Sequence, residues 1–374
     1  MKKIYLSALA LVAASALAAC SPSAAPATTA PAADATSQAA TSQAAPPPAP
    51  AKKLKLGIVI PSGDHGFTGE SVAHAKAEAD AQMKADPNLD IKVKDGIDAA
   101  AQIASIENML ASDKPDMIML WPMEGEALRS AAQSILDAGV KLVVYDRLIT
   151  NFQGLTAQIM GDNEGIGKDM GNYITQFYAK DATVNYLRFV GDSSTVTSQR
   201  SDSMDAVIDK AKFKQINETF VTNWSTQTAQ DQMEGWLNAK SKAEIESLNL
   251  IVTHDDEITV GIFNALDAYK GGAKLNVRLI TSVGGREDCM QAAERTKSGA
   301  KLATWYFSPS FIRESVRLSV ASLKGQPYTG ATETNGIYLI PSFSISNAGN
   351  AKYDFAAYRA SDIFKERSSI TVPA

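Results

Sequence analysis

Aromatic, acidic and arginine side chains stand where the apolar runs of this sequence end. Phe67 and Trp121 follow two such runs, and Asp146 with Arg147 follows a third. Carboxylates accept hydrogen bonds and guanidinium groups donate them, so together they can bind hydroxyl groups, which do both. A flat aromatic ring can cover the apolar C–H face of a sugar ring. The candidates for such a site are His65, Phe67, Trp121, Asp146, Arg147, Arg200, Trp224, Asp255 and Arg286.

Several of these candidates also have a purely structural interpretation. Asp146 and Arg147 are neighbours of opposite charge that could form an ion pair, and Trp121 could belong to the core. One carboxylate of the acidic run at 255–257 is expected to cap the helix that begins there. Within that run we expect Asp255 to bind a ligand and Asp256 to serve the structure.

Short apolar runs alternate with stretches of helical period from residue 53 onward. Strands are predicted at 54–60, 117–120, 142–145, 184–190, 249–253, 277–281 and 302–307. Between them, Ile103, Ile106 and Leu110 share one face of a helix. Such alternation predicts an α/β fold with parallel sheets covered by helices on both faces. Ligands of these sheets bind beyond the carboxyl ends of the strands, where the candidate residues stand.

Length and composition restrict the class of protein. A chain of 374 residues with 45% hydrophobic and 21% charged residues is long enough for two ordinary domains. A net charge of -5 argues against a nucleic-acid partner, which would require a basic surface. The two cysteines, Cys20 and Cys289, exclude a disulfide-stapled scaffold and a four-cysteine metal site. We expect no metal and no cofactor.

The amino-terminal segment has the layout of an export signal. Two lysines precede an apolar run at 4–17 that is too short to span a bilayer comfortably, so 1–19 is interpreted as a signal peptide. The sequence Leu17-Ala18-Ala19-Cys20 resembles the bacterial lipobox. This resemblance implies cleavage before Cys20, a lipid on that residue and a location on the periplasmic or cell-surface side of a membrane. The alternative is an ordinary cysteine near a conventional cleavage site.

A segment of biased composition follows this cysteine. Residues 20–52 consist mainly of Ala, Pro, Ser, Thr and Gln and contain no aromatic side chain. Such a segment cannot bury enough apolar surface to fold, so we interpret it as a tether. If Cys20 carries lipid, Cys289 has no partner and is expected to be a free, buried thiol.

The region from about 53 to 340 resembles the periplasmic sugar-binding proteins of ABC importers, in the ribose, galactose and xylose group. The resemblance starts from the strand Gly57-Ile58-Val59-Ile60-Pro61 and its loop. It implies that Phe67 stacks on the sugar, that Trp224 covers the second sugar face, and that Asp146-Arg147 and Arg200 bind sugar hydroxyls. His65 stands where the family has an Asn or Asp with the same role.

The sequence also departs from this family. Arg286 follows the position of a usual sugar-binding aspartate, Tyr306-Phe307 replaces a late amide, and Asp255 replaces an asparagine. No calcium-binding loop of the galactose-binder type occurs. These departures leave open which monosaccharide or polyol binds, and whether it is neutral or acidic.

The resemblance implies the fold of a type I periplasmic binding protein, with two Rossmann-like lobes of parallel sheet joined by a three-segment hinge. The expected bounds are 53–160 with 286–326 for one lobe and 161–285 with 327–374 for the other. The implied protein is a monomer that closes around a sugar and delivers it to an ABC permease. The tail at 341–374 lies beyond the usual end of the family.

The sequence also allows other functions to be considered beside this one. A receptor for chemotaxis or for a sensor kinase could use the same fold. Glycoside hydrolysis by Asp146 and Asp255 is disfavoured, and no enzyme is expected. The run Gly165-Ile166-Gly167-Lys168-Asp169-Met170-Gly171 lacks the spacing of a dinucleotide fingerprint, so its small residues are expected to allow close helix packing.

Overall fold

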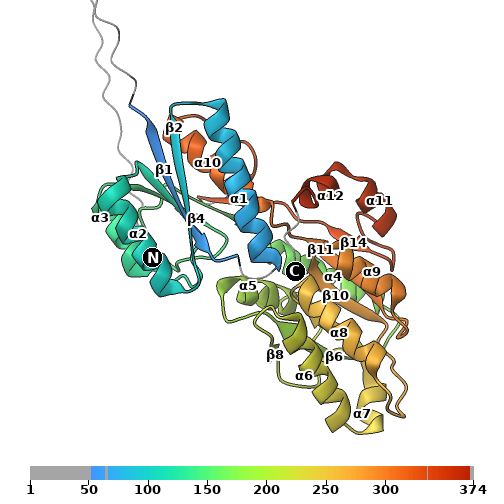
Figure 1. The fold of residues 1–374 in the computed structure, drawn as a ribbon. Helices are drawn as coiled ribbons and strands as arrows, with labels where there is room; N and C mark the ends of the chain where they lie inside the picture. The colour runs from blue at the N-terminus through green and yellow to red at the C-terminus, as the bar shows by residue number, and fades with distance from the viewer. Residues whose placement is uncertain (1–51, 64–65, 335, 371–374) are drawn as a thin grey trace, which may run out of the picture. The chain divides into compact units, whose positions relative to one another are not determined.

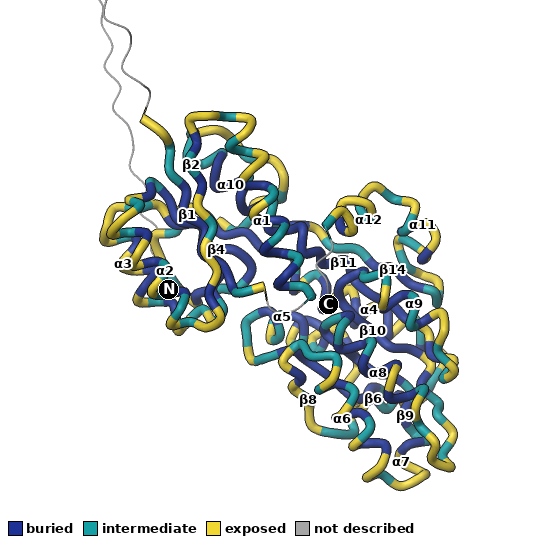
Figure 2. Tube along the Cα trace, viewed as in Figure 1, coloured by how far each residue is buried: buried dark blue, intermediate teal, exposed yellow. Residues whose placement is uncertain are grey.

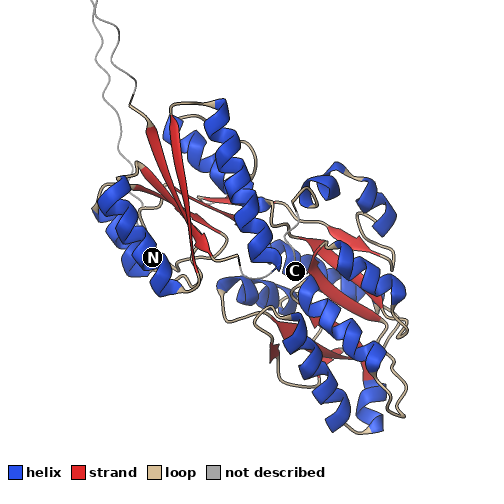
Figure 3. Ribbon diagram, viewed as in Figure 1, coloured by secondary structure: helices blue, strands red, loops and turns tan. Residues whose placement is uncertain are grey.

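Two mainly parallel sheets organise the chain, each formed by seven strands among the described residues. The computed structural model describes residues 52–63, 66–334 and 336–370. Cys20, His65 and the expected signal peptide and most of the expected tether therefore lie outside the described residues. Figures 1 and 3 show helices packed against the sheets, as expected from the alternation of strand and helix.

The first sheet and its helices are called lobe 1. Its strands in spatial order are β12 (Thr332–Thr334), β13 (Ile337–Ile340), β5 (Ala157–Gly161), β4 (Lys141–Tyr145), β3 (Met117–Leu120), β1 (Leu54–Pro61) and β2 (Leu89–Gly96). Its helices are α1 (Gly66–Ala85), α2 (Ala99–Asn108), α3 (Arg129–Asp137) and α10 (Phe311–Lys324), and a wider π-type turn at Met109–Asp113 extends α2. Only β12 runs antiparallel to its neighbour.

The second sheet and its helices are called lobe 2. Its strands are β14 (Ser344–Ser346), β11 (Lys301–Tyr306), β10 (Leu279–Gly284), β9 (Leu248–Thr253), β6 (Val184–Val190) and β7 (Phe213–Gln215), with β8 (Phe220–Val221) also beside β6. Its helices are α4 (Asn163–Phe177), α5 (Thr195–Asp205), α6 (Thr226–Ala239), α7 (Lys242–Ser247), α8 (Asp256–Ala268), α9 (Glu287–Arg295), α11 (Phe355–Ala360) and α12 (Asp362–Arg367). Antiparallel β14 lies at the sheet edge.

The inner strands are mostly buried, which explains their largely apolar sequence. Every residue of β3, β5 and β10 is buried, as expected for parallel strands covered on both faces. Figure 2 shows the same pattern, with buried strands inside and exposed residues on the outer sides of the helices. Several helices begin at a side-chain cap, among them Asp162 before α4 and Ser225 before α6.

The lobe bounds differ from those expected from the sequence. β11 pairs in parallel with β10, so residues 286–306 belong to lobe 2 rather than to lobe 1. β13 pairs with β5, so most of 327–340 belongs to lobe 1 rather than to lobe 2. Two glycines at the expected bounds, Gly285 and Gly325, have local roles instead. Gly325 ends α10 in a left-handed conformation with φ of 65°, and Gly285 makes a turn inside lobe 2.

The glycine run at 165–171 packs α4 against α5. A Cβ on Gly167 would lie 2.4 Å from the backbone oxygen of Arg200, and one on Gly171 would lie 2.4 Å from a methyl carbon of Val207. Close approach of two helices therefore accounts for these small residues, as the spacing indicated.

The carboxyl-terminal tail is part of lobe 2. Phe343 stacks on Tyr306 with ring centroids 4.9 Å apart, and the Tyr358 hydroxyl donates a hydrogen bond of 3.1 Å to the Gly285 carbonyl. Cys289 is buried, as expected, and forms no disulfide within the described part of the chain. The tail thus contributes apolar and hydrogen-bonded contacts to the edge of the second sheet.

Candidate functional site

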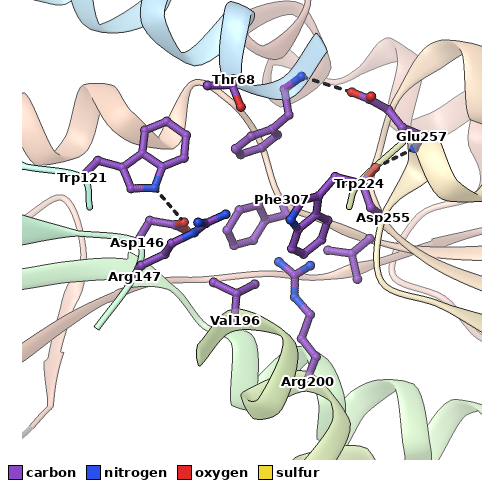
Figure 4. Close-up of a pocket in the computed structure, with 12 residues that line it drawn as sticks. Thr68, Trp121, Asp146, Arg147, Val196, Arg200, Trp224, Asp255, Glu257 and Phe307 are labelled. Atoms are coloured by element: carbon purple, nitrogen blue, oxygen red, sulfur yellow. Dashed lines mark hydrogen bonds between the residues drawn. The ribbon is translucent and has the colours of Figure 1, made fainter. Parts of the chain in front are cut away.

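A pocket lies at the carboxyl ends of the strands, with side chains from both lobes in its wall. It encloses about 570 Å³ of space, with the solvent at its open mouth included. Its lining residues are Phe67, Thr68, Trp121, Asp146, Arg147, Val196, Arg200, Trp224, Asp255, Glu257, Val283 and Phe307. Figure 4 shows them converging from separate elements.

Each lining side chain is placed by the end of a strand or the start of a helix. In lobe 1, Phe67 lies in the first turn of α1, Trp121 directly follows β3, and Asp146 directly follows β4. In lobe 2, Arg200 lies on α5, and Asp255 caps α8. Short loops at the carboxyl edges of parallel strands thus bring distant parts of the sequence together.

Aromatic rings form one continuous apolar surface in this pocket. The Phe67 ring meets the Trp121 ring edge-on at 6.2 Å and lies 5.7 Å from the Phe307 ring. Trp121 packs edge-on against Tyr145, which is fully buried. Trp121 therefore belongs both to the pocket wall and to the core. The surface can accept the apolar face of a ring-shaped ligand.

Asp146 presents an unused hydrogen-bond acceptor at the pocket. Trp121 Nε1 donates a hydrogen bond of 3.1 Å to Asp146 Oδ2, whereas the buried Oδ1 has no partner among the described residues. Burial raises the pKa of Asp146, and the charges of Arg147 and Arg200 oppose that shift. Its backbone is left-handed, with φ of 64°. Strained backbone and an unsatisfied buried acceptor are both typical of functional sites.

Arg147 and Trp224 meet at a carboxylate that the sequence analysis missed. Arg147 Nη2 donates to Asp192 Oδ2 at 3.1 Å, and Trp224 Nε1 donates to the same oxygen at 2.9 Å. The indole lies against Gly191, where a Cβ would be only 2.0 Å from Trp224 Cε2. Trp224 itself is left-handed, with φ of 62°. Arg147 therefore pairs with Asp192 rather than with the adjacent Asp146.

The charged side chain of Arg200 is buried, and no carboxylate among the described residues forms a hydrogen bond with it. Its Nε donates to Asn163 Oδ1 at 2.9 Å and its Nη1 to the His254 carbonyl at 2.7 Å. The guanidinium carbon lies 4.7 Å from the centroid of the Phe307 ring, a cation–π contact. Burial lowers the pKa of Arg200 to about 10, so it stays protonated at neutral pH.

The carboxylates at the start of α8 have different roles: some stabilise the fold and some line the pocket. Asp255 Oδ1 accepts a hydrogen bond of 2.7 Å from the backbone N–H of Glu257, capping the helix, and Asp255 also lines the pocket. Burial and the neighbouring Glu257 and Asp256 carboxylates raise the pKa of Asp255 well above its usual range. Asp256 is fully buried and accepts from Thr304 Oγ1 at 2.8 Å.

Arg286 does not line the pocket, although the sequence analysis predicts it as a site residue. Its guanidinium group bonds Asp288 and, at 2.9 Å, Glu257 Oε1. The same Glu257 oxygen accepts the Phe67 backbone N–H at 3.1 Å. The Arg286 guanidinium group thus binds two carboxylates of its own lobe. The contact with lobe 1 is made by Glu257, through the Phe67 backbone N–H.

Seven of the nine sequence candidates line one pocket. Of the other two, His65 lies outside the described residues and Arg286 is not among the lining residues. The residues that sequence reasoning missed are Thr68, Val196, Glu257, Val283, Phe307 and the supporting Asp192. Asp192 and Phe307 follow β6 and β11. The strand-end rule, applied to every strand, would have found both.

The described residues do not suggest a metal centre or a membrane span. No group of three or more His, Cys, Asp or Glu side chains in this part of the chain could hold a metal ion. No helix in the same part combines the length and apolar character needed to cross a bilayer.

Comparison with known proteins gives one family. The model of the periplasmic binding protein domain matches residues 56–327. The D-xylose-binding periplasmic protein of Haemophilus influenzae is 24% identical over 280 residues, covering 73% of this chain and 80% of that protein. A multiple sugar-binding periplasmic receptor of Rhizobium radiobacter is 23% identical, covering 67% and 74%.

A solved structure shows the same fold. The ABC transporter solute-binding protein of Bacillus halodurans, with bound myo-inositol, has a TM-score of 0.65 at 18% identity, covering 78% of this chain and 94% of that one. These relatives are binding proteins rather than enzymes. The family match and the two α/β lobes together identify this chain as a member of the periplasmic binding protein family, with the type I fold.

Proposed function

We propose that this protein captures a monosaccharide or a related polyol between its lobes and delivers it to an ABC importer. The observation that carries the proposal is the composition of the pocket. Three aromatic rings line it together with the buried guanidinium group of Arg200 and with Asp146, whose buried Oδ1 has no hydrogen-bond partner in the described part of the chain. Rings of this kind suit the C–H faces of a sugar, and the two charged groups suit its hydroxyls.

Contacts from both lobes would couple binding to closure. Phe67, Trp121, Asp146 and Arg147 belong to lobe 1, and Arg200, Trp224 and Asp255 to lobe 2. A molecule that touches both walls favours the closed state by its differential affinity for that state. Hydrogen bonds to charged groups contribute about 1.5–3 kcal/mol each, so an epimer that leaves one unpaired would bind more weakly.

A thermal-shift screen tests the sugar assignment. The panel contains D-xylose, D-glucose, myo-inositol and a sugar acid, because neutral and acidic ligands both remain open. A ligand at 100 times its dissociation constant stabilises the folded state by about 2.7 kcal/mol, which raises the melting temperature measurably. Titration calorimetry of each positive compound then gives its affinity. An extended panel of pentoses, hexoses, polyols and sugar acids without any shift would contradict the proposal.

We also propose that lipid on Cys20 anchors the protein to a membrane surface. Each acyl CH₂ buried in the bilayer contributes about 0.8 kcal/mol, so more than one chain gives firm attachment. Cys20→Ala should move the exported protein from the membrane fraction to the soluble fraction. An unchanged distribution, with the precursor processed as before, would contradict lipid attachment.

Sugar sensing is the second candidate function, because one of the relatives is named a receptor. The two functions differ in their partner. Deletion of the gene should abolish uptake of the identified sugar if the protein serves an importer. It should leave uptake intact and abolish the chemotactic or transcriptional response if the protein serves a sensor.

A further inference from the structure

Asp192 lies next to the pocket, and both of its carboxylate oxygens accept hydrogen bonds from other residues of the protein. It follows β6, and its Oδ1 accepts the backbone N–H of Ser194 at 2.9 Å. Its Oδ2 accepts both the Trp224 indole N–H at 2.9 Å and the Arg147 guanidinium N–H at 3.1 Å. Asp192 is not one of the residues that line the pocket, whereas both of its side-chain donors are.

One of these hydrogen bonds, from Arg147 to Asp192, joins the two lobes. Arg147 comes from the loop after β4 in lobe 1, and Asp192 and Trp224 belong to lobe 2. A second bond lies beside them, from the Leu148 backbone N–H to Thr195 Oγ1 at 3.2 Å. The Arg147–Asp192 ion pair can therefore exist only when the two loops approach each other.

The ion pair is shielded enough to contribute more than a surface pair. The Arg147 side chain is 16% exposed and that of Asp192 is 24% exposed. Burial alone would raise the pKa of Asp192, but Arg147 and the bonds from Ser194 and Trp224 hold it below its usual range. The carboxylate is thus ionised at neutral pH. Removing it would leave a largely buried guanidinium group without its charged partner.

The indole depends on the same carboxylate for its orientation. Trp224 precedes α6 and has a left-handed backbone. The bond to Asp192 and the contact with Gly191 hold the ring in place.

We propose that Asp192 is a positioning residue that fixes Trp224 and Arg147 for binding and joins the two lobes across the pocket without touching the ligand. This inference rests on the proposed function. Because the Arg147–Asp192 ion pair joins the two lobes around the pocket, its loss should act mainly on the rate at which the ligand leaves. In related complexes most differences in affinity lie in that rate.

The test compares Asp192→Ala and Asp192→Asn with Asp205→Ala. Asp205 forms an ion pair with Arg188 in lobe 2 and does not line the pocket, so it is a matched control. With D-xylose as the probe, Asp192→Ala should raise the dissociation rate about tenfold or more. Asp192→Asn retains an acceptor for the indole and should have a smaller effect. Asp205→Ala should stay within about twofold of the wild type.

A second measurement requires no sugar. The indole N–H resonance of Trp224, assigned with Trp224→Phe, should shift and exchange faster with solvent in ligand-free Asp192→Ala, but not in Asp205→Ala. If the wild type does not bind D-xylose, that sugar is excluded, and the indole measurement still decides the role of Asp192. An unchanged indole resonance, or a dissociation rate of Asp192→Ala equal to that of the wild type, would overturn the inference.

Discussion

Gly191→Ala should weaken ligand binding, although Gly191 does not line the pocket. The added Cβ would lie 2.0 Å from Trp224 Cε2 and 2.1 Å from Cδ2. Carbon atoms pack best at about 3.5–4.0 Å, so the indole must move by more than about 1 Å. The half-buried ring can move into the pocket, where it takes space from the ligand and disturbs its bond to Asp192.

The size of the effect follows from the loss of one stacking surface. We expect affinity to fall by about 1–2 kcal/mol, a factor of roughly 5–30 in the dissociation constant. Titration calorimetry with the sugar found in the screen measures this directly, and tryptophan fluorescence reports the displaced indole. The melting temperature should change less than the affinity, because the ring has open space on its pocket side.

Gly235→Ala is the matched control for this substitution. Gly235 lies inside α6, and a Cβ there would meet no atom within 4 Å. The control should leave binding unchanged and stabilise the fold by about 0.5–1 kcal/mol, since alanine favours helix. Wild-type affinity and fluorescence in Gly191→Ala would refute the reasoning that the indole must stay against Gly191 to bind.

Three further substitutions separate binding from stability. Trp224→Ala should weaken sugar binding by about 1–3 kcal/mol in calorimetry with little change in unfolding, and unchanged affinity would remove Trp224 from the site. Asp255→Asn keeps a good helix cap and should raise the free energy of unfolding at pH 7.5. The pKa of Asp255 is raised in the folded state. Ionisation of this carboxyl group therefore lowers the free energy of unfolding as the pH rises through the folded-state pKa, and the loss is absent below the unfolded-state pKa near 3.8. The gain from Asp255→Asn in urea unfolding should therefore shrink as pH falls towards 4, and an equal gain at both pH values would contradict this cause. Gly325→Ala places a side chain at φ of 65° and should destabilise the fold by about 1 kcal/mol, and an unchanged urea midpoint would argue against a left-handed helix end.

Sequence reasoning found the binding region because parallel strands share one functional edge. Trp121 and Asp146 directly follow neighbouring strands of lobe 1, so their convergence did not require knowledge of how the lobes pack. Phe307 also follows a strand directly, but the rule was not applied to it and it was interpreted only as a lost amide. It lines the pocket because its ring packs against Gly161, where a Cβ would be 2.2 Å away.

The lobe bounds could not be obtained from local features of the sequence. Gly285 and Gly325 break the chain locally, but strand pairing between segments far apart in sequence decides which lobe a segment joins. The expected role of Arg286 failed for a similar reason. An arginine near a strand end can bind a ligand or a carboxylate, and here Asp288 and Glu257 occupy it.

The sequence by itself determined the α/β class, the positions of most strands and the edge at which aromatic and charged groups gather, because these depend on local periodicity and on strand direction. The tertiary structure alone decided which charges pair across the lobes, which Asp146 oxygen lacks a partner among the described residues, and which way the indole of Trp224 turns. Those features depend on contacts between residues distant in sequence and on backbone conformations such as left-handed Asp146 and Trp224, which local propensities do not favour.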